Sequence, residues 1–392
     1  MPESGRGGDL IMAMAPALSR CCPVCQSNQA IKLCSFHFAL FDDLDLSGDK
    51  TLLCCPACTM LYEEVAFSEE QLSHYYQIND HYSASAAGGT GSASEDNNRR
   101  YDRIIDQLDA GSGTLILDYG CGQGGLIARC LARGLRAAGI EKSARSRQMA
   151  EAAGLNVYES LDDFLARCPD HVGAVVFSHV LEHVLDPLTI LRHAAERFGE
   201  TLFFIEVPDA ENYLKPEAIR WEEMYFEHIN HFRKESLRRL AENIPLDIIR
   251  EEQVSFSPDL NEVACLVLTG KVSPEKRPAQ AASGPDGCLT PDLPIGPSDP
   301  ELPQGPIAIW GISQYAMMLL GTCPDLSRRT VRLFDASTAK IGRTIGGLRV
   351  ESPDGILSLD EQVTLLIPRS KYLEQMLALA RQKFFRAPIM VI

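Results

Sequence analysis

The sequence predicts an α/β protein with a doubly wound, mostly parallel sheet, a small cysteine-rich module before it and a smaller α/β domain after it. From about residue 99 to residue 270, short apolar runs alternate with helix-like segments, which is the pattern of βαβ units. Two C-P-x-C pairs precede this region, and a Pro- and Gly-rich stretch separates it from a second α/β pattern. A chain of 392 residues has room for two or three such domains.

The composition restricts the partners of the protein. Hydrophobic residues make up 45% and charged residues 23%, which is ordinary for a globular chain. The net charge of −16 argues against a nucleic-acid partner, although a local basic pocket for a phosphorylated small molecule stays open. No apolar run reaches the 18 residues of a membrane span, so we expect no membrane partner.

The first residues resemble a signal peptide in one respect only. The run at residues 10–18 is apolar, but Glu3 and Asp9 precede it and no clean cleavage site follows. We therefore expect a flexible tail at residues 1–19 and a cytoplasmic protein.

The 13 cysteines then indicate metal ligands or free thiols rather than disulfides. Two C-P-x-C pairs, at residues 22–25 and 55–58, can each place two thiolates on one tight turn, and together they can close a tetrahedral zinc site. Cys21 and Cys54 each precede a pair, but the spacing favours the others. The predicted ligands of a structural Zn²⁺ are Cys22, Cys25, Cys55 and Cys58. Buried free cysteines are the alternative.

The domain boundaries follow from composition. We expect a zinc-binding module at residues 20–70, then a helix at "SEEQLSHYY" and a flexible Gly/Ser/Ala-rich connection within residues 71–98. The main domain spans residues 99–270. Residues 271–305 hold too much Pro and Gly for a core element and form a linker. The last domain spans residues 306–392.

A glycine-rich turn opens the main domain. In "LILDYGCGQGG" a short strand runs into three alternate glycines, which allow positive φ and close approach of a ligand. The next strand ends at Glu141, about 20 residues further on, where an acid can accept hydrogen bonds from ribose hydroxyls. A dinucleotide site prefers G-x-G-x-x-G facing a diphosphate, which Asp118 would repel. The acid suits a cationic cofactor that bears an amino acid, and a dinucleotide site is the alternative.

This turn, followed by "NVYESLDDF" and "GAVVFSHVLEHVLDP", resembles the class I S-adenosylmethionine-dependent methyltransferases over residues 99–270. The resemblance implies a methyltransferase sheet and S-adenosylmethionine as cofactor. It implies that the methionine end lies on Asp118, Gly120, Gly122 and Gly124. It also implies that Glu141 holds the ribose, that Leu161 and Asp162 lie near the adenine, and that His179 touches the methionine portion.

His179 and His183 bracket Glu182, and a helix would place both imidazoles on one face. We interpret them as packing behind the cofactor rather than as metal ligands, because no third ligand is apparent nearby in the sequence.

The stretch "FEHINHF", residues 226–232, follows the fifth strand at the end of the sheet where open α/β folds bind ligands. A neutral imidazole with a pKa near 6.5 suits proton removal at pH 7. We expect Phe226 and Phe232 to be core and His231 to be structural.

The whole layout resembles the zinc-containing sugar C-methyltransferases, which act on nucleotide-linked 4-keto deoxysugars. Tyr225, Glu227 and His228 match the Y-x-E-H positions of that family. The resemblance implies that His228 is the general base, that Tyr225 donates to the developing oxyanion and that Glu227 orients His228. O- or N-methylation of a sugar or other small polar metabolite stays open, because related methyltransferases share E-H-x-x-x-F.

A different class of function also stays open, namely a zinc-ribbon module that binds RNA or protein and serves methylation of a macromolecule. The acidic balance and the lack of a basic run beside the C-P-x-C pairs argue against it.

The last domain begins with a strand, turn and helix, "GPIAIWGISQYAMMLLG", and its second strand ends at Asp335. It resembles half of a Rossmann-like fold and the C-terminal domain of the same sugar methyltransferases. Only Gly311 remains of the glycine fingerprint, so a dinucleotide is not expected. Either the domain is structural, or its turn holds the nucleotide of the substrate through Ser313, Gln314 and Tyr315. Nothing in the sequence indicates an oligomeric state.

Overall fold

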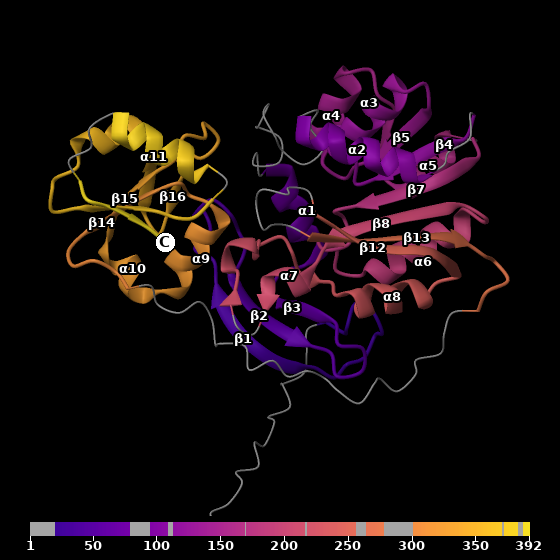
Figure 1. The fold of residues 1–392 in the computed structure, drawn as a ribbon, viewed down its shortest axis with the longest axis horizontal. Helices are drawn as coiled ribbons and strands as arrows, with labels where there is room; N and C mark the ends of the chain where they lie inside the picture. Colours follow the sequence, from indigo (N-terminus) through magenta and orange to yellow (C-terminus); the bar gives the residue numbers. More distant parts are fainter. Residues whose placement is uncertain are drawn as a thin grey trace, which may run out of the picture.

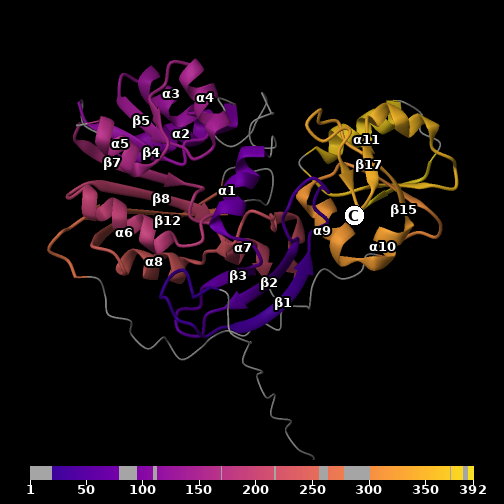
Figure 2. The same ribbon diagram turned by 180° about the vertical axis from the view of Figure 1, so that it is seen from behind.

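A computed structural model describes residues 20–78, 95–108, 113–168, 170–215, 218–255, 264–277, 301–370, 372–382 and 387–392. The predicted tail, most of the predicted flexible connection and most of the predicted linker lie outside the described residues. The described residues form an antiparallel sheet, a seven-stranded sheet, a six-stranded sheet and a short two-stranded ribbon. Figures 1 and 2 show the antiparallel sheet lying between the two larger α/β units.

The seven-stranded sheet has the order β12-β13-β8-β7-β4-β5-β6. Its strands are β4 (Leu115–Tyr119), β5 (Arg136–Ile140), β6 (Val157–Tyr158), β7 (Val172–Ser178), β8 (Leu202–Pro208), β12 (Leu246–Ser255) and β13 (Ala264–Val272). Strands β4 to β8 are parallel, and β13 is antiparallel to both its neighbours. The chain leaves β4 toward β6 and returns to β7 on the other side of β4. This reversal creates a switch point, where such sheets bind ligands, and it confirms the predicted doubly wound sheet.

Helices cover both faces of this sheet, because its parallel strands are apolar on both sides. One face packs against α2 (Glu95–Leu108), α3 (Gly125–Ala132) and α4 (Ala144–Ala152). The other packs against α5 (Leu161–Arg167), α6 (Pro187–Arg197) and α8 (Lys234–Glu242). In β4, Leu115 and Leu117 point to the second face and Ile116 to the first.

Local caps decide where the helices start. Ser143 begins α4 and Ser160 begins α5, each by accepting a backbone N–H of the first turn. Asp186 caps α6, and Pro187 occupies its first position. The residues before Asp186 therefore form a turn rather than the start of α6, and this turn lies at the carboxyl end of β7.

The antiparallel sheet joins the N-terminal module to the main domain. It has the order β1 (Ile31–His37), β2 (Asp49–Cys54), β3 (Leu61–Val65) and β11 (Asn230–His231). Asn230 pairs with Tyr62, and His231 pairs with Leu61. The helix expected at "SEEQLSHYY" is present as α1 (Glu69–Ile78). A strand from the predicted main domain thus completes the sheet of the predicted zinc module.

The chain between β8 and α8 forms small elements beside this sheet. They are α7 (Ala210–Tyr213), β9 (Leu214–Lys215), β10 (Ala218–Ile219) and a 3₁₀ turn, Trp221–Glu223. Their buried side chains share one apolar cluster with β1 to β3 and the C-terminal unit. The predicted domain boundaries stay predictions.

The C-terminal unit is a second, mostly parallel sheet with the order β16-β17-β15-β14-β18-β19. The strands are β14 (Ile307–Trp310), β15 (Thr330–Phe334), β16 (Thr344–Ile345), β17 (Leu348–Glu351), β18 (Thr364–Ile367) and β19 (Ile389–Val391). Its helices are α9 (Gln314–Thr322), α10 (Pro324–Arg329), α11 (Leu373–Gln382) and a 3₁₀ helix, Pro353–Ser358. A Rossmann-like relationship and a bound nucleotide stay predictions. Of the helices in the described ranges, none is long and apolar enough to cross a membrane.

Candidate active site and metal centre

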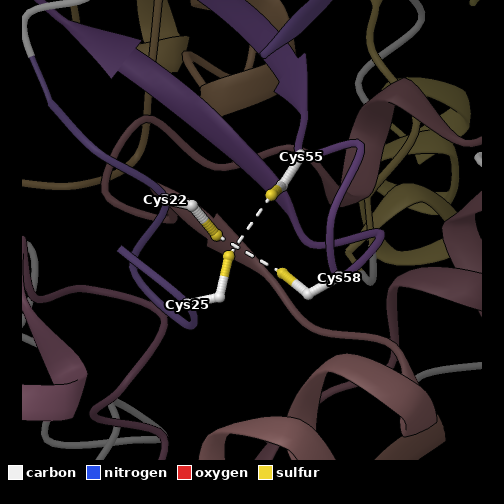
Figure 3. Close-up of side chains that lie close together, drawn as sticks. All are labelled: Cys22, Cys25, Cys55 and Cys58. Atoms are coloured by element: carbon white, nitrogen blue, oxygen red, sulfur yellow. Dashed lines mark hydrogen bonds between the residues drawn. The ribbon is translucent and has the colours of Figure 1, made fainter. Parts of the chain in front are cut away.

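The four cysteines predicted as ligands lie together. The Sγ atoms of Cys22, Cys25, Cys55 and Cys58 all lie within 4.8 Å of one another (Figure 3). Two Sγ–Sγ distances between the C-P-x-C pairs are 3.5 Å. A tetrahedral ion with Zn–S bonds of about 2.3 Å separates its sulfurs by about 3.8 Å, so the set fits zinc. Neither Cys21 nor Cys54 belongs to the cluster.

The two C-P-x-C turns have the same backbone, and we call residues 22–27 and 55–60 the knuckles. In each, the first N–H donates to the sixth carbonyl at 2.8 or 2.9 Å, and the fifth N–H donates to the first carbonyl at 2.9 Å. The fifth residues, Gln26 and Thr59, have φ of +60° and +58°. The matching turns aim four thiols at one point, which supports a closed, structural site.

The glycine turn (residues 118–124) follows β4. Gly120, Gly122 and Gly124 have φ of +76°, +55° and +80°, where side chains are disfavoured. A Cβ on Gly120 would lie 2.7 Å from Cγ2 of Val180. The turn therefore packs closely against the chain that follows β7, at the switch point of the sheet.

Asp118 supplies a buried acid at the start of the glycine turn. Within the described residues its carboxylate makes no hydrogen bond or ion pair. Burial, reinforced by Glu141 and opposed by the Arg100 guanidinium, raises the pKa of Asp118 to about 7. A buried carboxylate of this kind fits the cationic amino group of a methionine portion.

Glu141 lies directly after β5 and reaches back to the glycine turn. Its Oε2 accepts the Gly122 N–H at 2.9 Å, and its Oε1 accepts the Ser143 N–H at 2.7 Å. Burial raises the pKa of Glu141. The structure thus brings the predicted ribose-binding acid to the predicted cradle.

The two residues predicted near the adenine differ in their surroundings. Leu161 is buried at the start of α5. The Asp162 side chain is 77% exposed, and its Oδ1 lies 3.7 Å from His193 Nε2 on α6. No contact of the described residues joins Asp162 to the glycine turn.

His179 begins the turn after β7. It has an unusual φ of +55°, and its N–H donates to the Glu206 carbonyl at 2.9 Å. Its Nδ1 lies 3.2 Å from Glu182 Oε1, and its Nε2 lies 3.6 Å from Cys265 Sγ. Burial and Arg100 oppose protonation, but Cys265 and Glu182 outweigh them and raise the pKa of His179. Contact of His179 with a cofactor stays a prediction.

Residues 225–231, which we call the histidine segment, pack against the same turn. Ile229 N–H and Asn230 N–H donate to the Glu182 carbonyl at 2.8 and 3.1 Å. The His183 Nδ1 lies 3.2 Å from the Glu227 carbonyl. These contacts hold the histidine segment at the carboxyl end of the seven-stranded sheet.

His228 lies between two rings at this edge. Its centroid is 4.7 Å from that of His183 and 4.9 Å from that of Tyr225, which is 37% exposed. Burial, together with neighbouring groups that carry positive charge when protonated, holds the pKa of His228 well below its usual value. His228 therefore offers a lone pair at neutral pH.

The expectation that His179 and His183 are not metal ligands stays a prediction, but the structure brings a further candidate ligand close to them. The structure places His228 beside Glu182 and His183, with one ligand atom of each within 4.8 Å of the others. Spacing along the chain does not show this grouping, because the histidine segment is far from β7 in the sequence.

Glu227 has partners other than the one expected. Its Oε1 accepts a hydrogen bond from the Tyr75 hydroxyl, and Gln314 Nε2 lies 3.0 Å from each carboxylate oxygen. Phe226 N–H donates to Gln314 Oε1 at 3.3 Å. The predicted contact with His228 is not among the contacts of the described residues, because the carboxylate turns toward α1 and α9.

A buried polar network connects the histidine segment to the antiparallel sheet. Lys50 Nζ donates to the Phe226 carbonyl at 2.8 Å and lies 2.7 Å from Glu63 Oε2. Glu63 Oε1 lies 3.2 Å from His231 Nε2, and the Tyr213 hydroxyl lies 2.8 Å from His231 Nδ1. His231, Phe226 and Phe232 are buried, as expected.

Sequence reasoning missed three of these residues. Tyr75 lies in α1, and Lys50 and Glu63 lie on neighbouring strands of the antiparallel sheet. None stands in a recognisable motif. The one available signal was an acid and a base within strands that are otherwise buried.

Side chains of the C-terminal unit itself bond to the turn between β14 and α9. Asp335 Oδ2 accepts the Ile312 N–H at 2.8 Å, and Lys340 Nζ lies 2.8 Å from the Ile312 carbonyl and 3.2 Å from Asp335. Ser313 caps α9, and Tyr315 packs partly buried against the apolar cluster. Gln314, the next of the three residues singled out here, contacts Phe226 and Glu227 of the histidine segment.

Residues 93–251 match a family model described as a methyltransferase domain. This region is a methyltransferase domain. It is of the class I, S-adenosylmethionine-dependent type, so the predicted methyltransferase fold of this region and the predicted enzyme class are confirmed. The match leaves out the knuckles and the C-terminal unit, and their functions are proposals.

Curated relatives match a part of this chain. An uncharacterized methyltransferase of Bacillus licheniformis is 32% identical over 107 residues, which is 26% of this chain and 49% of that protein. A ubiquinone biosynthesis O-methyltransferase of Xanthomonas campestris pv. campestris is 36% identical over 101 residues, 23% of this chain and 42% of that protein. The chain thus spans about half the length of the curated relatives it matches, or less.

Solved structures with similar folds include magnesium protoporphyrin IX methyltransferase (ChlM) of Synechocystis PCC 6803 with bound SAH. It is 16% identical, has a TM-score of 0.40 and covers 53% of this chain and 100% of its own. The [4+2]-cyclase SpnF is 17% identical, with a TM-score of 0.41, over 53% of this chain and 97% of its own.

Proposed function

We propose that the protein transfers a methyl group from S-adenosylmethionine to a small-molecule acceptor, with His228 as the base that removes a proton from the acceptor. One observation carries the proposal. The half-buried imidazole of His228, its pKa held low, lies beside the exposed Tyr225 at the carboxyl end of the methyltransferase sheet. A neutral imidazole at this place can accept a proton at pH 7.

The cradle for the cofactor is built from residues already described. When bound, S-adenosylmethionine supplies an electrophilic methyl group on a sulfonium. Asp118 would hold the amino group, the backbone of the glycine turn would lie against the methionine portion, and Glu141 would hold the ribose. The Gly122 N–H that now donates to Glu141 orients this carboxylate in advance.

The acceptor we propose is a nucleotide-linked keto-deoxysugar that is methylated on the carbon next to the ketone. Such a carbon must lose a proton before it attacks the methyl group, so it needs a base more than a hydroxyl does. His228 would take the proton, and Tyr225 would donate to the enolate oxygen. The hydrogen bonds of Gln314 to Glu227 link the C-terminal unit to this place, which supports a role for that unit in closing over the acceptor.

The cysteine knuckles support the same proposal. Four thiols at tetrahedral spacing suit a structural Zn²⁺, and the second knuckle joins β2 to β3 of the sheet that includes β11 of the histidine segment. The ion would therefore stabilise the framework that holds His228 and take no part in the chemistry.

O-methylation is the second candidate. The relatives from Xanthomonas campestris and Klebsiella pneumoniae are named ubiquinone biosynthesis O-methyltransferases. A hydroxyl acceptor would use the same base, because His228 could remove a proton from oxygen as the methyl group transfers.

Deuterium exchange tests the base and the acceptor together. The protein is incubated in D₂O with a panel of nucleotide-linked keto sugars and no methyl donor, and exchange of the α-proton is followed by NMR. We expect exchange by the wild type and a loss of about 10²–10⁴-fold in His228→Ala. His171→Ala, an exposed residue directly before β7, is the matched control and should exchange normally.

A second assay uses labelled methyl donor with the same panel and with hydroxylated analogues. Methyl transfer to hydroxyl acceptors alone, without α-proton exchange, would replace the carbon acceptor by an oxygen acceptor. Equal exchange by wild type and His228→Ala would remove His228 from the proposed role.

A further inference from the structure

A second set of metal-ligand types lies outside the knuckles. Glu182, His183 and His228 each place one ligand atom within 4.8 Å of the others. A carboxylate and two imidazoles suit a divalent transition-metal ion such as Zn²⁺ or Co²⁺. The first two come from the turn after β7 and the third from the histidine segment, so the set exists only in the folded chain.

Glu182 is buried between two imidazoles that lie at ion-pair distance from its carboxylate. Its side chain is 1% exposed, and neither carboxylate oxygen makes a hydrogen bond within the described residues. His179 Nδ1 lies 3.2 Å from Oε1 without the alignment of a hydrogen bond, and His183 Nε2 lies 3.8 Å away. A buried carboxylate whose oxygens accept no hydrogen bond keeps lone pairs for a further donor or a cation.

His183 is oriented as metal-binding histidines are. Its Nδ1 lies 3.2 Å from the Glu227 carbonyl, which can only accept, so Nδ1 carries the proton. In a neutral imidazole the lone pair is then on Nε2, the nitrogen that faces Glu182. A backbone carbonyl on the other nitrogen is a common second partner of a histidine that binds metal.

Two of the three candidate ligands are partly exposed. The His183 side chain is 18% exposed, and His228 is half-buried beside the exposed Tyr225. Three protein ligands leave a fourth position of a tetrahedral ion open to water, as in catalytic rather than structural zinc sites.

We propose that Glu182, His183 and His228 form a second, open site for a divalent transition-metal ion, separate from the closed site of the knuckles. A neutral imidazole has one lone pair, so a metal on His228 would compete with the proton that the proposed function assigns to it. Occupancy of the open site should therefore inhibit proton transfer.

Cobalt titration tests the site without any acceptor. Full-length protein with zinc in the knuckles is titrated with Co²⁺, and the visible d–d bands of a nitrogen- and oxygen-liganded ion are recorded. These bands are separate from the thiolate charge-transfer bands of a knuckle site. We expect one further equivalent in the wild type, and binding at least about tenfold weaker in Glu182→Gln and His183→Ala. His171→Ala should bind as the wild type does.

The wild-type titration tests the open site even if a variant fails to fold. No further equivalent in the wild type, or equal binding by the folded variants, would overturn the proposal. A wild type that shows His228-dependent exchange but binds no second ion keeps the proposed function and loses the open site. A second ion bound by a protein without such exchange keeps the site and removes the proposed base.

Discussion

At the scale of single residues, burial shifts the pKa of the acid in the glycine turn and the pKa of the candidate base in opposite directions. It raises the pKa of Asp118 to about 7, and it holds the pKa of His228 well below its usual value. In both cases the environment disfavours the charged form. The affinity for a cationic ligand should therefore depend on whether Asp118 is ionised, whereas the neutral imidazole of His228 can accept a proton.

Cofactor affinity should rise with pH through the titration of Asp118. The carboxyl group is protonated below about pH 7 and ionised above it, and only the ionised form attracts a cationic amino group. Between pH 6 and pH 7 we expect S-adenosylhomocysteine to bind about fivefold more tightly, as measured by calorimetry. Asp118→Asn should bind weakly at both pH values. A wild-type affinity that does not change with pH would contradict this assignment.

At the scale of elements, the knuckles are part of the core of the methyltransferase domain. The cysteine side chains share one apolar cluster with α6 and α8. Asn243, directly after α8, donates to the Val24 carbonyl of the first knuckle at 2.8 Å. Loss of metal should therefore destabilise more than the N-terminal module.

Substitutions should distinguish the predicted zinc ligand Cys22 from its sequence neighbour Cys21, which is not a predicted ligand. Cys22→Ser removes a buried ligand thiol, whereas Cys21→Ser alters an exposed one. We expect Cys22→Ser to lose zinc and to lower the Tm, at about 2–4 °C for each kcal/mol lost. Cys21→Ser should retain both. Zinc content by emission spectrometry and calorimetric Tm check this. Full zinc content in Cys22→Ser would exclude it as a ligand.

A buried lysine of β2 should stabilise the histidine segment. Lys50→Met would remove the ammonium group beside Glu63 Oε2 and the donor to the Phe226 carbonyl, and would leave Glu63 with His231 alone of these two partners. We expect a loss of about 3–5 kcal/mol in the free energy of unfolding, measured by urea denaturation. Lys32→Met, on the exposed side of β1, should change it by less than about 0.5 kcal/mol. Similar values for the two variants would show that the buried pair contributes little.

At the scale of the whole molecule, the antiparallel sheet connects the two α/β units. Ala39 N–H donates to the Met317 carbonyl of α9 at 2.8 Å, and the Arg343 guanidinium pairs with Asp43 at 2.6 Å. One apolar cluster runs from β1 to β3 into the C-terminal unit. The described parts of the protein are therefore coupled through shared packing.

Gln314 should couple the C-terminal unit to methyl transfer. Gln314→Ala removes the donor to Glu227 and the acceptor of the Phe226 N–H. We expect the transfer rate to fall about ten- to a hundredfold, because the histidine segment loses its position, while cofactor affinity is unchanged. Gln382→Ala, at the exposed end of α11, is the matched control. A parallel loss of cofactor affinity would point to general disruption instead.

Much of the fold could be predicted because it follows local rules. Alternate glycines behind Asp118 require a left-handed turn, and the periodicity of apolar residues identifies β4 and α3. What could not be predicted was which segments meet. The antiparallel sheet takes its last strand, β11, from residues far beyond its other three, and such a pairing leaves no local pattern.

The choice of His228 came from a family resemblance and stays a prediction. For the rest of the candidate site, the sequence by itself determined the knuckles and the glycine turn with Glu141. These depend on spacing along the chain, which fixes backbone conformation over a few residues. Only the tertiary structure decided that Glu227 faces Tyr75 and Gln314, and that His228 lies beside Glu182 and His183. The direction of a side chain and its partners depend on packing between distant segments, which no local spacing encodes.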